Sequence, residues 1–153
     1  MLVKLLRGLP GSGKTTFIHR INQNAIVCSA DDYRINSKGE YVFRAEDSTR
    51  VHSECFLKFL RVCQISKPED RPMVLYVDNT NLTAWELAPY VLVAEAFGFY
   101  CEIIRVECDW LIAARRNIHL VPTDKMFSMW QTLMSERLPS PWRETIVLSD
   151  IAS

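Results

Sequence analysis

The chain has 153 residues, about the length of one domain, which is enough to bury roughly 68–70% of the unfolded surface without a disulfide or a metal. Hydrophobic residues make up 48% and charged residues 24% of the chain, which excludes a disordered or fibrous protein. Eighteen basic residues balance eighteen acidic ones, so the zero net charge excludes bulk electrostatic binding of nucleic acid but not a local basic groove.

Short apolar runs alternate with helical patterns along the whole chain. The runs predict strands at residues 2–6, 25–28, 73–77, 99–106 and 145–148. Apolar spacing and capping residues predict helices at 15–21, 44–65, 83–97, 109–117 and 122–137. A polar loop bounded by prolines is expected at 67–72. The alternation predicts one α/β domain, residues 1–153, in which a parallel sheet of four or five strands carries helices on both faces.

The cysteines and the apolar runs bear on the compartment. Five cysteines occur at wide spacing and without a Cys-x-x-Cys pair, so we expect reduced thiols and no zinc site. The N-terminal segment 1–7 is too short for a signal peptide, and no apolar run approaches the roughly 20 residues of a membrane span. We therefore expect a cytoplasmic, reducing location and no membrane partner. The sequence leaves the oligomeric state open.

The segment after the first predicted strand carries the strongest motif of the chain. Residues 8–15 read Gly-Leu-Pro-Gly-Ser-Gly-Lys-Thr, which matches the phosphate-binding pattern G-x-x-x-x-G-K-[ST] at every fixed position. A strand precedes it and a helix follows it, so backbone N–H groups and the helix N-terminus would face a phosphate. This predicts binding of ATP, with Lys14 on the β- and γ-phosphates and Thr15 on Mg²⁺. The predicted nucleotide-binding residues are Gly8, Pro10, Gly11, Ser12, Gly13, Lys14, Thr15 and Thr16.

A carboxylate follows the apolar run 73–77. Asp78 would lie at the carboxyl end of the sheet, beside the phosphate loop, where it could hold Mg²⁺ through water. The alternative is a turn aspartate that bonds its own backbone, which the sequence Asp-Asn-Thr-Asn at 78–81 would also suit.

Two adjacent carboxylates follow the run 25–28. A phosphotransferase that acts on a hydroxyl needs a carboxylate to orient that hydroxyl and accept its proton, and either Asp31 or Asp32 could do so. Arg34 offers a planar fork suited to a phosphate on the acceptor. The alternative is a pair of carboxylates that cap a helix N-terminus.

Two basic residues lie near the end of the helix predicted at 109–117. Phosphoryl transfer spreads negative charge over the equatorial oxygens, and one arginine of the pair Arg115 and Arg116 could face them from a lid. Only one is expected to do so, because neighbours on a helix point about 100° apart. Two solvated surface arginines are the alternative. His119 is a further candidate for contacting a phosphate or the acceptor.

Several of these motifs together resemble the small P-loop kinases of the polynucleotide 5′-kinase family. The matching segments occur in family order and cover about residues 2–135: Gly-Leu-Pro-Gly-Ser-Gly-Lys-Thr-Thr at 8–16, Asp-Asp-Tyr-Arg at 31–34, Asp78 with Thr-Asn-Leu at 80–82, Arg-Asn at 116–117 and Val-Pro at 121–122. The P-loop is shared by many families, whereas its combination with Asp-Asp-Tyr-Arg and Thr-Asn-Leu is much more specific.

The resemblance implies a three-layer P-loop kinase fold and a role for each matched residue. Lys14 and Thr15 would bind the triphosphate and its metal. Asp31 would be the general base on a 5′-hydroxyl, Arg34 would engage the phosphate of the acceptor nucleotide, and Arg116 would stabilise the transferring phosphoryl group. Further candidates for contacts with the acceptor or the lid are Asp32, Asn81, Arg115 and His119.

The chain departs from the family pattern at two places. Asn79 stands where the family can have an aspartate directly before the threonine, so Asp78 is the better candidate for the Mg²⁺ side. The lid lacks a further arginine after Arg116 and Asn117, and has the form Arg-Asn-Ile-His-Leu-Val-Pro at 116–122. Either His119 or Arg115 compensates, or the acceptor differs from a plain polynucleotide end.

Three functions are compatible with these motifs. The first is transfer of the γ-phosphate of ATP to the 5′-hydroxyl end of DNA or RNA, which the 31–34 motif favours. The second is a P-loop kinase for a small molecule such as a nucleoside, a nucleotide or a sugar derivative, which the altered lid favours. The third is a nucleotide-binding module without catalysis, which the two retained carboxylates disfavour.

Overall fold

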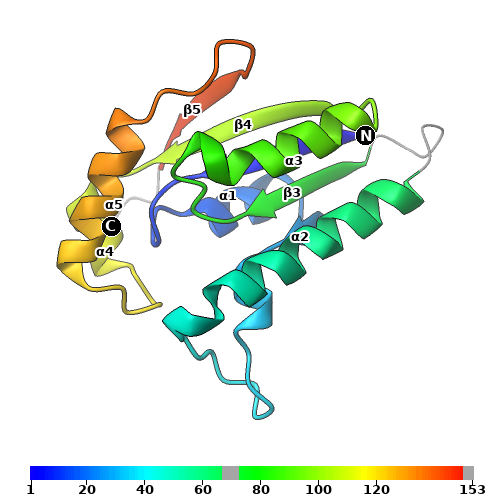
Figure 1. Cartoon of the computed structure of the whole chain (residues 1–153). Helices are drawn as coiled ribbons and strands as arrows, with labels where there is room; N and C mark the ends of the chain where they lie inside the picture. Colours follow the sequence, from blue (N-terminus) through cyan, green and yellow to red (C-terminus); the bar gives the residue numbers. More distant parts are fainter. Residues whose placement is uncertain (67–72, 150–153) are drawn as a thin grey trace.

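The computed structural model describes residues 1–66 and 73–149, and in that part of the chain it forms one five-stranded parallel sheet (Figure 1). The strands are β1 (Leu2–Arg7), β2 (Ile26–Cys28), β3 (Val74–Asp78), β4 (Tyr100–Glu107) and β5 (Glu144–Leu148). Their order in the sheet is β2-β3-β1-β4-β5. The predicted α/β class with a parallel sheet is confirmed, at the upper of the two expected strand numbers.

The helices follow the predicted order with shifted ends. They are α1 (Lys14–Ile21), α2 (Ser48–Ile65), α3 (Ala84–Ala96), α4 (Trp110–Arg115) and α5 (Thr123–Ser135), with short 3₁₀ helices η1 (Ala30–Tyr33) and η2 (Ala45–Asp47). The prediction that α2 begins at residue 44 is wrong, because η2 occupies its first turn. The prediction that α4 reaches residue 117 is also wrong, because the helix ends at Arg115. The loop expected at 67–72 lies outside the described residues.

Two side-chain caps explain where helices begin. Thr83 and Glu86 form the capping box at the start of α3, in which the Thr83 hydroxyl accepts from the Glu86 N–H and the Glu86 carboxylate accepts from the Thr83 N–H. The Asp109 carboxylate accepts from the N–H groups of Leu111 and Ile112 at the start of α4. Both caps agree with the sequence prediction.

Helices cover both faces of the sheet and give three layers. Val3 and Leu5 of β1 point into a core with side chains of α2 and α3, whereas Leu6 points to the other face and packs with Ile18 of α1. Figure 1 shows α2 and α3 on one side of the strands, and α4 and α5 beyond their carboxyl ends. Leu9 of the loop after β1 packs there with α4 and α5.

The described residues hold neither a metal cluster nor a spanning helix. No group of three or more His, Cys, Asp or Glu side chains in residues 1–66 and 73–149 could bind a metal ion together. All five cysteines are free thiols. Within the same ranges, none of the helices is long and apolar enough to cross a bilayer.

A buried arginine ties the end of β1 to its surroundings. The Arg7 side chain is 0% exposed, and its guanidinium donates to the carbonyl oxygens of Asn81 (3.1 Å) and Leu82 (2.7 Å) and to Glu144 Oε1 (2.7 Å). Asn81 itself has a positive φ of 44°, and its amide donates to the Leu6 carbonyl oxygen at 2.7 Å. Arg7 therefore fixes the loop after β3 against β1 and β5.

Replacing Arg7 with methionine should lower the free energy of unfolding by about 3–5 kcal/mol, because Glu144 and two carbonyl groups would lose their buried partner. Urea unfolding of the wild type and Arg7→Met measures this change. Lys4→Met is the control, since Lys4 lies 3.7 Å from Glu102 at a partly exposed site and should contribute under about 1 kcal/mol. Equal losses in the two variants would contradict the structural role of Arg7.

Candidate active site

The carboxyl ends of β1 and β3 bring the phosphate loop beside Asp78. In the parallel register of these strands Leu6 lies opposite Asp78, so the loop that leaves β1 starts next to the loop that leaves β3. The Gly8 N–H donates to the Thr80 carbonyl oxygen at 2.9 Å and holds the two loops together. The strand ends thus assemble the site at one edge of the sheet, as expected for a parallel α/β sheet.

Two glycines give the phosphate loop, residues 8–15, its shape. Gly13 has a φ of 94° and caps α1 without a side chain, so the first N–H groups of the helix stay open to an anion. Gly11 has a φ of 76°, and a Cβ there would collide with the Ala113 carbonyl oxygen in α4. The glycines are needed because the backbone turns left-handed and passes close to α4.

Lys14 lies folded against the phosphate loop. Its ammonium donates to the carbonyl oxygens of Gly8 (3.1 Å) and Leu9 (2.8 Å). Burial lowers the pKa of Lys14, and the negative charges of Asp78 and Asp31 oppose that shift. A buried cation that is balanced by two carboxylates is suited to exchange its carbonyl partners for phosphate oxygens.

Thr15 and Asp78 make the oxygen pair predicted for the metal. The Thr15 hydroxyl donates to Asp78 Oδ2 at 2.6 Å. Burial raises the pKa of Asp78, while the charge of Lys14 and the Thr15 hydrogen bond oppose the rise. One carboxylate and one hydroxyl beside a phosphate loop fit Mg²⁺, which takes oxygen ligands and completes its shell with phosphates and water.

Buried polar contacts fix the start of η1. The Asn79 side chain accepts from the Ala30 N–H at 2.9 Å and is itself buried. Ser29 caps η1 by accepting from the Asp31 N–H, and its hydroxyl donates to the Asp78 carbonyl oxygen at 3.0 Å. The position of Asp31 is therefore set from the end of β3, the same strand end that carries Asp78.

Three side chains surround the carboxylate of Asp31, which is 47% exposed. The Tyr41 hydroxyl donates to Oδ1 at 3.0 Å, and Arg34 Nε lies 3.6 Å from the same oxygen. His119 Nε2 lies 3.5 Å from Oδ2. Burial and the Asp31 charge raise the pKa of Tyr41, so this phenol stays protonated and acts as a donor.

Arg34 has protein partners in addition to Asp31. The guanidinium is buried and donates to the Arg44 carbonyl oxygen (3.2 Å) and to the Ser48 hydroxyl (3.4 Å), and it lies 4.6 Å from the centroid of the Phe43 ring. The fork that the sequence assigns to an acceptor phosphate is thus engaged by the segment between η1 and α2.

Two further candidates for contacts with the acceptor are engaged by other parts of the protein. Asp32 is exposed and pairs with Lys58 of α2 at 3.1 Å. The Asn81 amide is buried and donates to the Leu6 carbonyl oxygen. Of the two adjacent carboxylates, Asp31 is the one that lies against Tyr41 and His119, and its negative charge acts on Lys14.

The lid segment, residues 116–122 between α4 and α5, reaches Asp31 through its histidine. Arg115 is exposed at the end of α4, and Arg116 follows as the residue that ends the helix. The Asn117 amide donates to the Val121 carbonyl oxygen at 2.9 Å and closes the segment on itself. The His119 side chain of the lid segment lies 3.5 Å from the Asp31 carboxylate.

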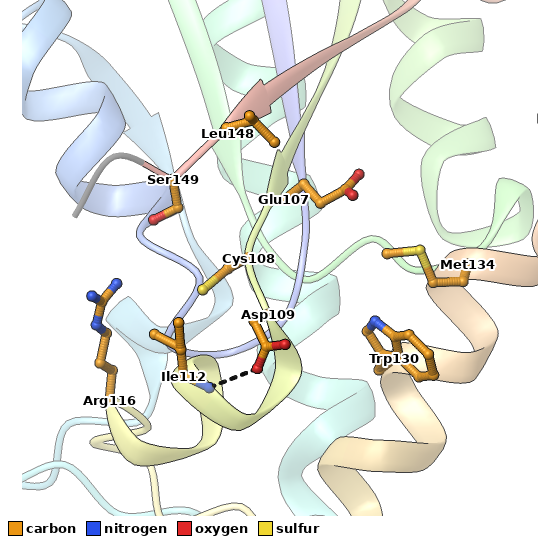
Figure 2. A pocket seen from close by; sticks show the side chains of 9 residues that line it. All are labelled: Glu107, Cys108, Asp109, Ile112, Arg116, Trp130, Met134, Leu148 and Ser149. Carbon is orange, nitrogen blue, oxygen red and sulfur yellow. Dashed lines mark hydrogen bonds between the residues drawn. The ribbon is translucent and has the colours of Figure 1, made fainter. Parts of the chain in front are cut away.

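A cavity of about 400 Å³ lies between α4, α5 and the carboxyl ends of β4 and β5 (Figure 2). Trp130 and Met134 of α5 line one side, and Arg116 stands with Cys108 and Ser149 on the other. The cavity neighbours the phosphate loop, because Gly11 packs on the backbone of Ala113 and Arg116 at the end of the same helix.

Sequence reasoning missed Tyr41, and it saw Asn79 only as a departure from a pattern. The Ile35–Tyr41 bridge that positions Tyr41 is made by a turn in which the Gly39 N–H donates to the Asn36 carbonyl oxygen. The residues Asn-Ser-Lys-Gly at 36–39 were an available signal for that turn. No sequence signal indicated that Asn79 would bond Ala30.

The comparison with known proteins agrees with this geometry. Residues 3–121, more than half of the chain, match the protein family described as AAA domain. The chain belongs to the AAA domain family. NEDD4-binding protein 2 of Homo sapiens is 31% identical to this AAA domain over an alignment of 136 residues that covers 84% of the chain. The chain spans only 7% of the length of that relative, so the similarity concerns one segment of a much larger protein.

Two solved structures share the fold of this AAA domain. A gluconokinase from Sinorhizobium meliloti 1021 has a TM-score of 0.56 at 12% identity and covers 98% of this chain and 83% of its own. A chain of the Pnkp1/Rnl/Hen1 RNA repair complex has a TM-score of 0.64 at 17% identity, over 87% of this chain and 44% of its own. The fold is that of P-loop kinases, which implies nucleotide binding.

Acidification should remove the Mg²⁺ dependence of ATP binding through Asp78. Because the pKa of Asp78 is raised, this carboxylate takes up its proton at a higher pH than an ordinary aspartate and then no longer supports the cation. Calorimetric titration of ATP with and without Mg²⁺, from about pH 8 to about pH 5, measures the effect.

Asp78→Asn and Asp32→Asn provide the matched comparison. ATP also titrates in this range, and the Asp78→Asn variant, which lacks the carboxylate, isolates that contribution. We expect Mg²⁺ to raise the ATP affinity of Asp78→Asn only slightly at every pH. The ATP affinity of Asp32→Asn should depend on Mg²⁺ as that of the wild type does. An unchanged Mg²⁺ benefit in Asp78→Asn would contradict the assignment.

Proposed function

We propose that this domain transfers the γ-phosphate of ATP to the 5′-hydroxyl end of a DNA or RNA strand. The observation that carries the proposal is the arrangement of Asp31, whose carboxylate is oriented by Tyr41 and Arg34 and lies close enough to act on the charge of Lys14. A carboxylate beside a phosphate loop is what a kinase needs to orient an acceptor hydroxyl.

The phosphate loop and Lys14 would hold the β- and γ-phosphates, with the open N-terminus of α1 facing the same anion. Thr15 and Asp78 would hold Mg²⁺, which neutralises charge on the phosphates when bound. The cavity between α4 and α5 would take the nucleoside part of ATP, since Trp130 and Met134 give it an apolar wall.

Asp31 would accept the proton of the acceptor hydroxyl late in the transfer. The acceptor oxygen forms a bond to the γ-phosphorus, the bond from that phosphorus to the oxygen of ADP breaks, and the proton moves to the Asp31 carboxylate. Arg34 and Tyr41 would orient the Asp31 carboxylate, Arg34 through its positive charge and Tyr41 through its hydrogen bond.

His119 would take the place of the missing lid arginine on the acceptor side. Its Nε2 lies 3.5 Å from Asp31 Oδ2 and its ring lies 4.5 Å from the Tyr41 ring, so it links the lid segment to the proposed base. Arg116 would contribute positive charge from the end of α4, where it lines the cavity. Arg115 has no comparable contact in the described residues and is the weaker candidate.

The acceptor class separates this proposal from its alternative. The resemblance of the segments 8–16, 31–34 and 80–82 to polynucleotide 5′-kinases favours a strand end. A small-molecule acceptor is the second candidate, because the same fold occurs in a gluconokinase and because the lid segment departs from the polynucleotide kinase pattern. Intracellular nucleic acid ends are the partner that follows from the first candidate.

Asp31→Asn should lower the rate of phosphate transfer to a 5′-hydroxyl oligonucleotide by about 10²- to 10⁴-fold, because the amide cannot accept the proton. Labelled ATP and a single-turnover assay measure this rate. The affinity for ATP should change little, since Asp31 lies on the acceptor side.

Asp32→Asn is the matched control, because this neighbouring carboxylate pairs with Lys58 instead of facing Tyr41. It should transfer phosphate at nearly the wild-type rate. Full activity in Asp31→Asn would exclude Asp31 as the base. Transfer by the wild type to a nucleoside or a sugar derivative, but to no oligonucleotide, would favour the second candidate.

A further inference from the structure

An exposed aromatic ring lies next to the proposed base. Phe43, in the segment between η1 and η2, is 54% exposed. The Arg34 guanidinium lies over this ring at 4.6 Å from its centroid, and is itself buried and bonded to Arg44 and Ser48. One face of the ring is therefore held by a fixed cation while more than half of the residue remains open to solvent.

The same guanidinium connects the ring to Asp31. Arg34 Nε lies 3.6 Å from Asp31 Oδ1, so the carboxylate and the Phe43 ring flank a single side chain. In a nucleotide, one ribose separates the 5′-oxygen from the base, and a ribose is comparable in size with a guanidinium. An acceptor whose 5′-hydroxyl meets Asp31 can thus bring its base to the ring.

Exposed aromatic residues are common on protein surfaces and need no ligand. Phe43 differs from a scattered surface residue in two respects. First, its ring packs on the Arg34 guanidinium, which is itself held by hydrogen bonds to Arg44 and Ser48. Second, Phe43 belongs to the same segment as Tyr41, whose hydroxyl donates to Asp31. Preorganised rings beside a basic side chain are what single-stranded nucleic acid stacks on.

We propose that Phe43 is a stacking platform for the base of the 5′-terminal nucleotide of the acceptor, an inference that rests on the proposed function. The ligand class is a purine or pyrimidine base attached to a 5′-hydroxyl sugar. Stacking is tolerant of base identity, so the platform selects nucleotides over plain sugars without selecting a sequence.

A cycle of two enzymes and two acceptors tests the platform. The acceptors are oligonucleotides that differ only at the 5′-terminal residue, which is either a normal nucleotide or an abasic one with its 5′-hydroxyl retained. Wild type should show a kcat/KM about tenfold higher on the normal acceptor. Phe43→Ala should lose that preference by slowing on the normal acceptor alone, whereas Phe43→Trp should keep it.

Phe97→Ala is the matched control. Phe97 is 42% exposed, stacks on Phe99 and follows α3 at the amino edge of the sheet, opposite the site. It should keep the wild-type preference, and unchanged ATP affinity in Phe43→Ala verifies that this variant is folded. Equal loss on both acceptors in Phe43→Ala, or no preference in wild type, would overturn the platform while leaving the kinase intact. No transfer to any oligonucleotide by wild type would overturn the proposed function and the platform with it.

Discussion

The parallel pairing of β1 and β3 is the constraint on which the candidate site depends. Its register sets Leu6 opposite Asp78, so the loop that begins at Gly8 and the loop that ends at Asn81 leave the sheet side by side. Because the two loops are neighbours, the Gly8 N–H reaches the Thr80 carbonyl oxygen and the short Thr15 side chain reaches the Asp78 carboxylate. No long, flexible side chain is needed for either hydrogen bond. A site built on strand ends is more rigid than one built on loops alone.

The end of β3 also reaches across to the acceptor side. Asp78 faces Thr15, whereas the next residue, Asn79, turns its buried amide to Ala30 and thereby fixes η1 and Asp31. The last residue of β3 and the residue after it thus hold the metal side and the proposed base in a defined relation. This division explains why an asparagine suits position 79, since a carboxylate there could accept from the Ala30 N–H but would add a buried charge.

Local patterns in the sequence predicted the sheet, the phosphate loop and the caps at Thr83 and Asp109, because each depends on residues a few positions apart. The partners of Arg34 and Asp32 could not be predicted in this way. Arg34 bonds Arg44 and Ser48, and Asp32 bonds Lys58, only because α2 packs beside η1. The same holds for His119 and Asp31, because the lid segment and η1, which lie far apart in the sequence, bring them together.

A competition between acceptors tests the central claim, that this edge of the sheet passes the γ-phosphate of ATP to a 5′-hydroxyl nucleic acid end. The wild-type protein would be given labelled ATP with 5′-hydroxyl DNA, 5′-hydroxyl RNA, free nucleosides and gluconate together. The account predicts that label enters an oligonucleotide and is recovered as a 5′-mononucleotide after nuclease digestion. Label found only in gluconate or a free nucleoside, or at no acceptor despite bound ATP, would contradict it.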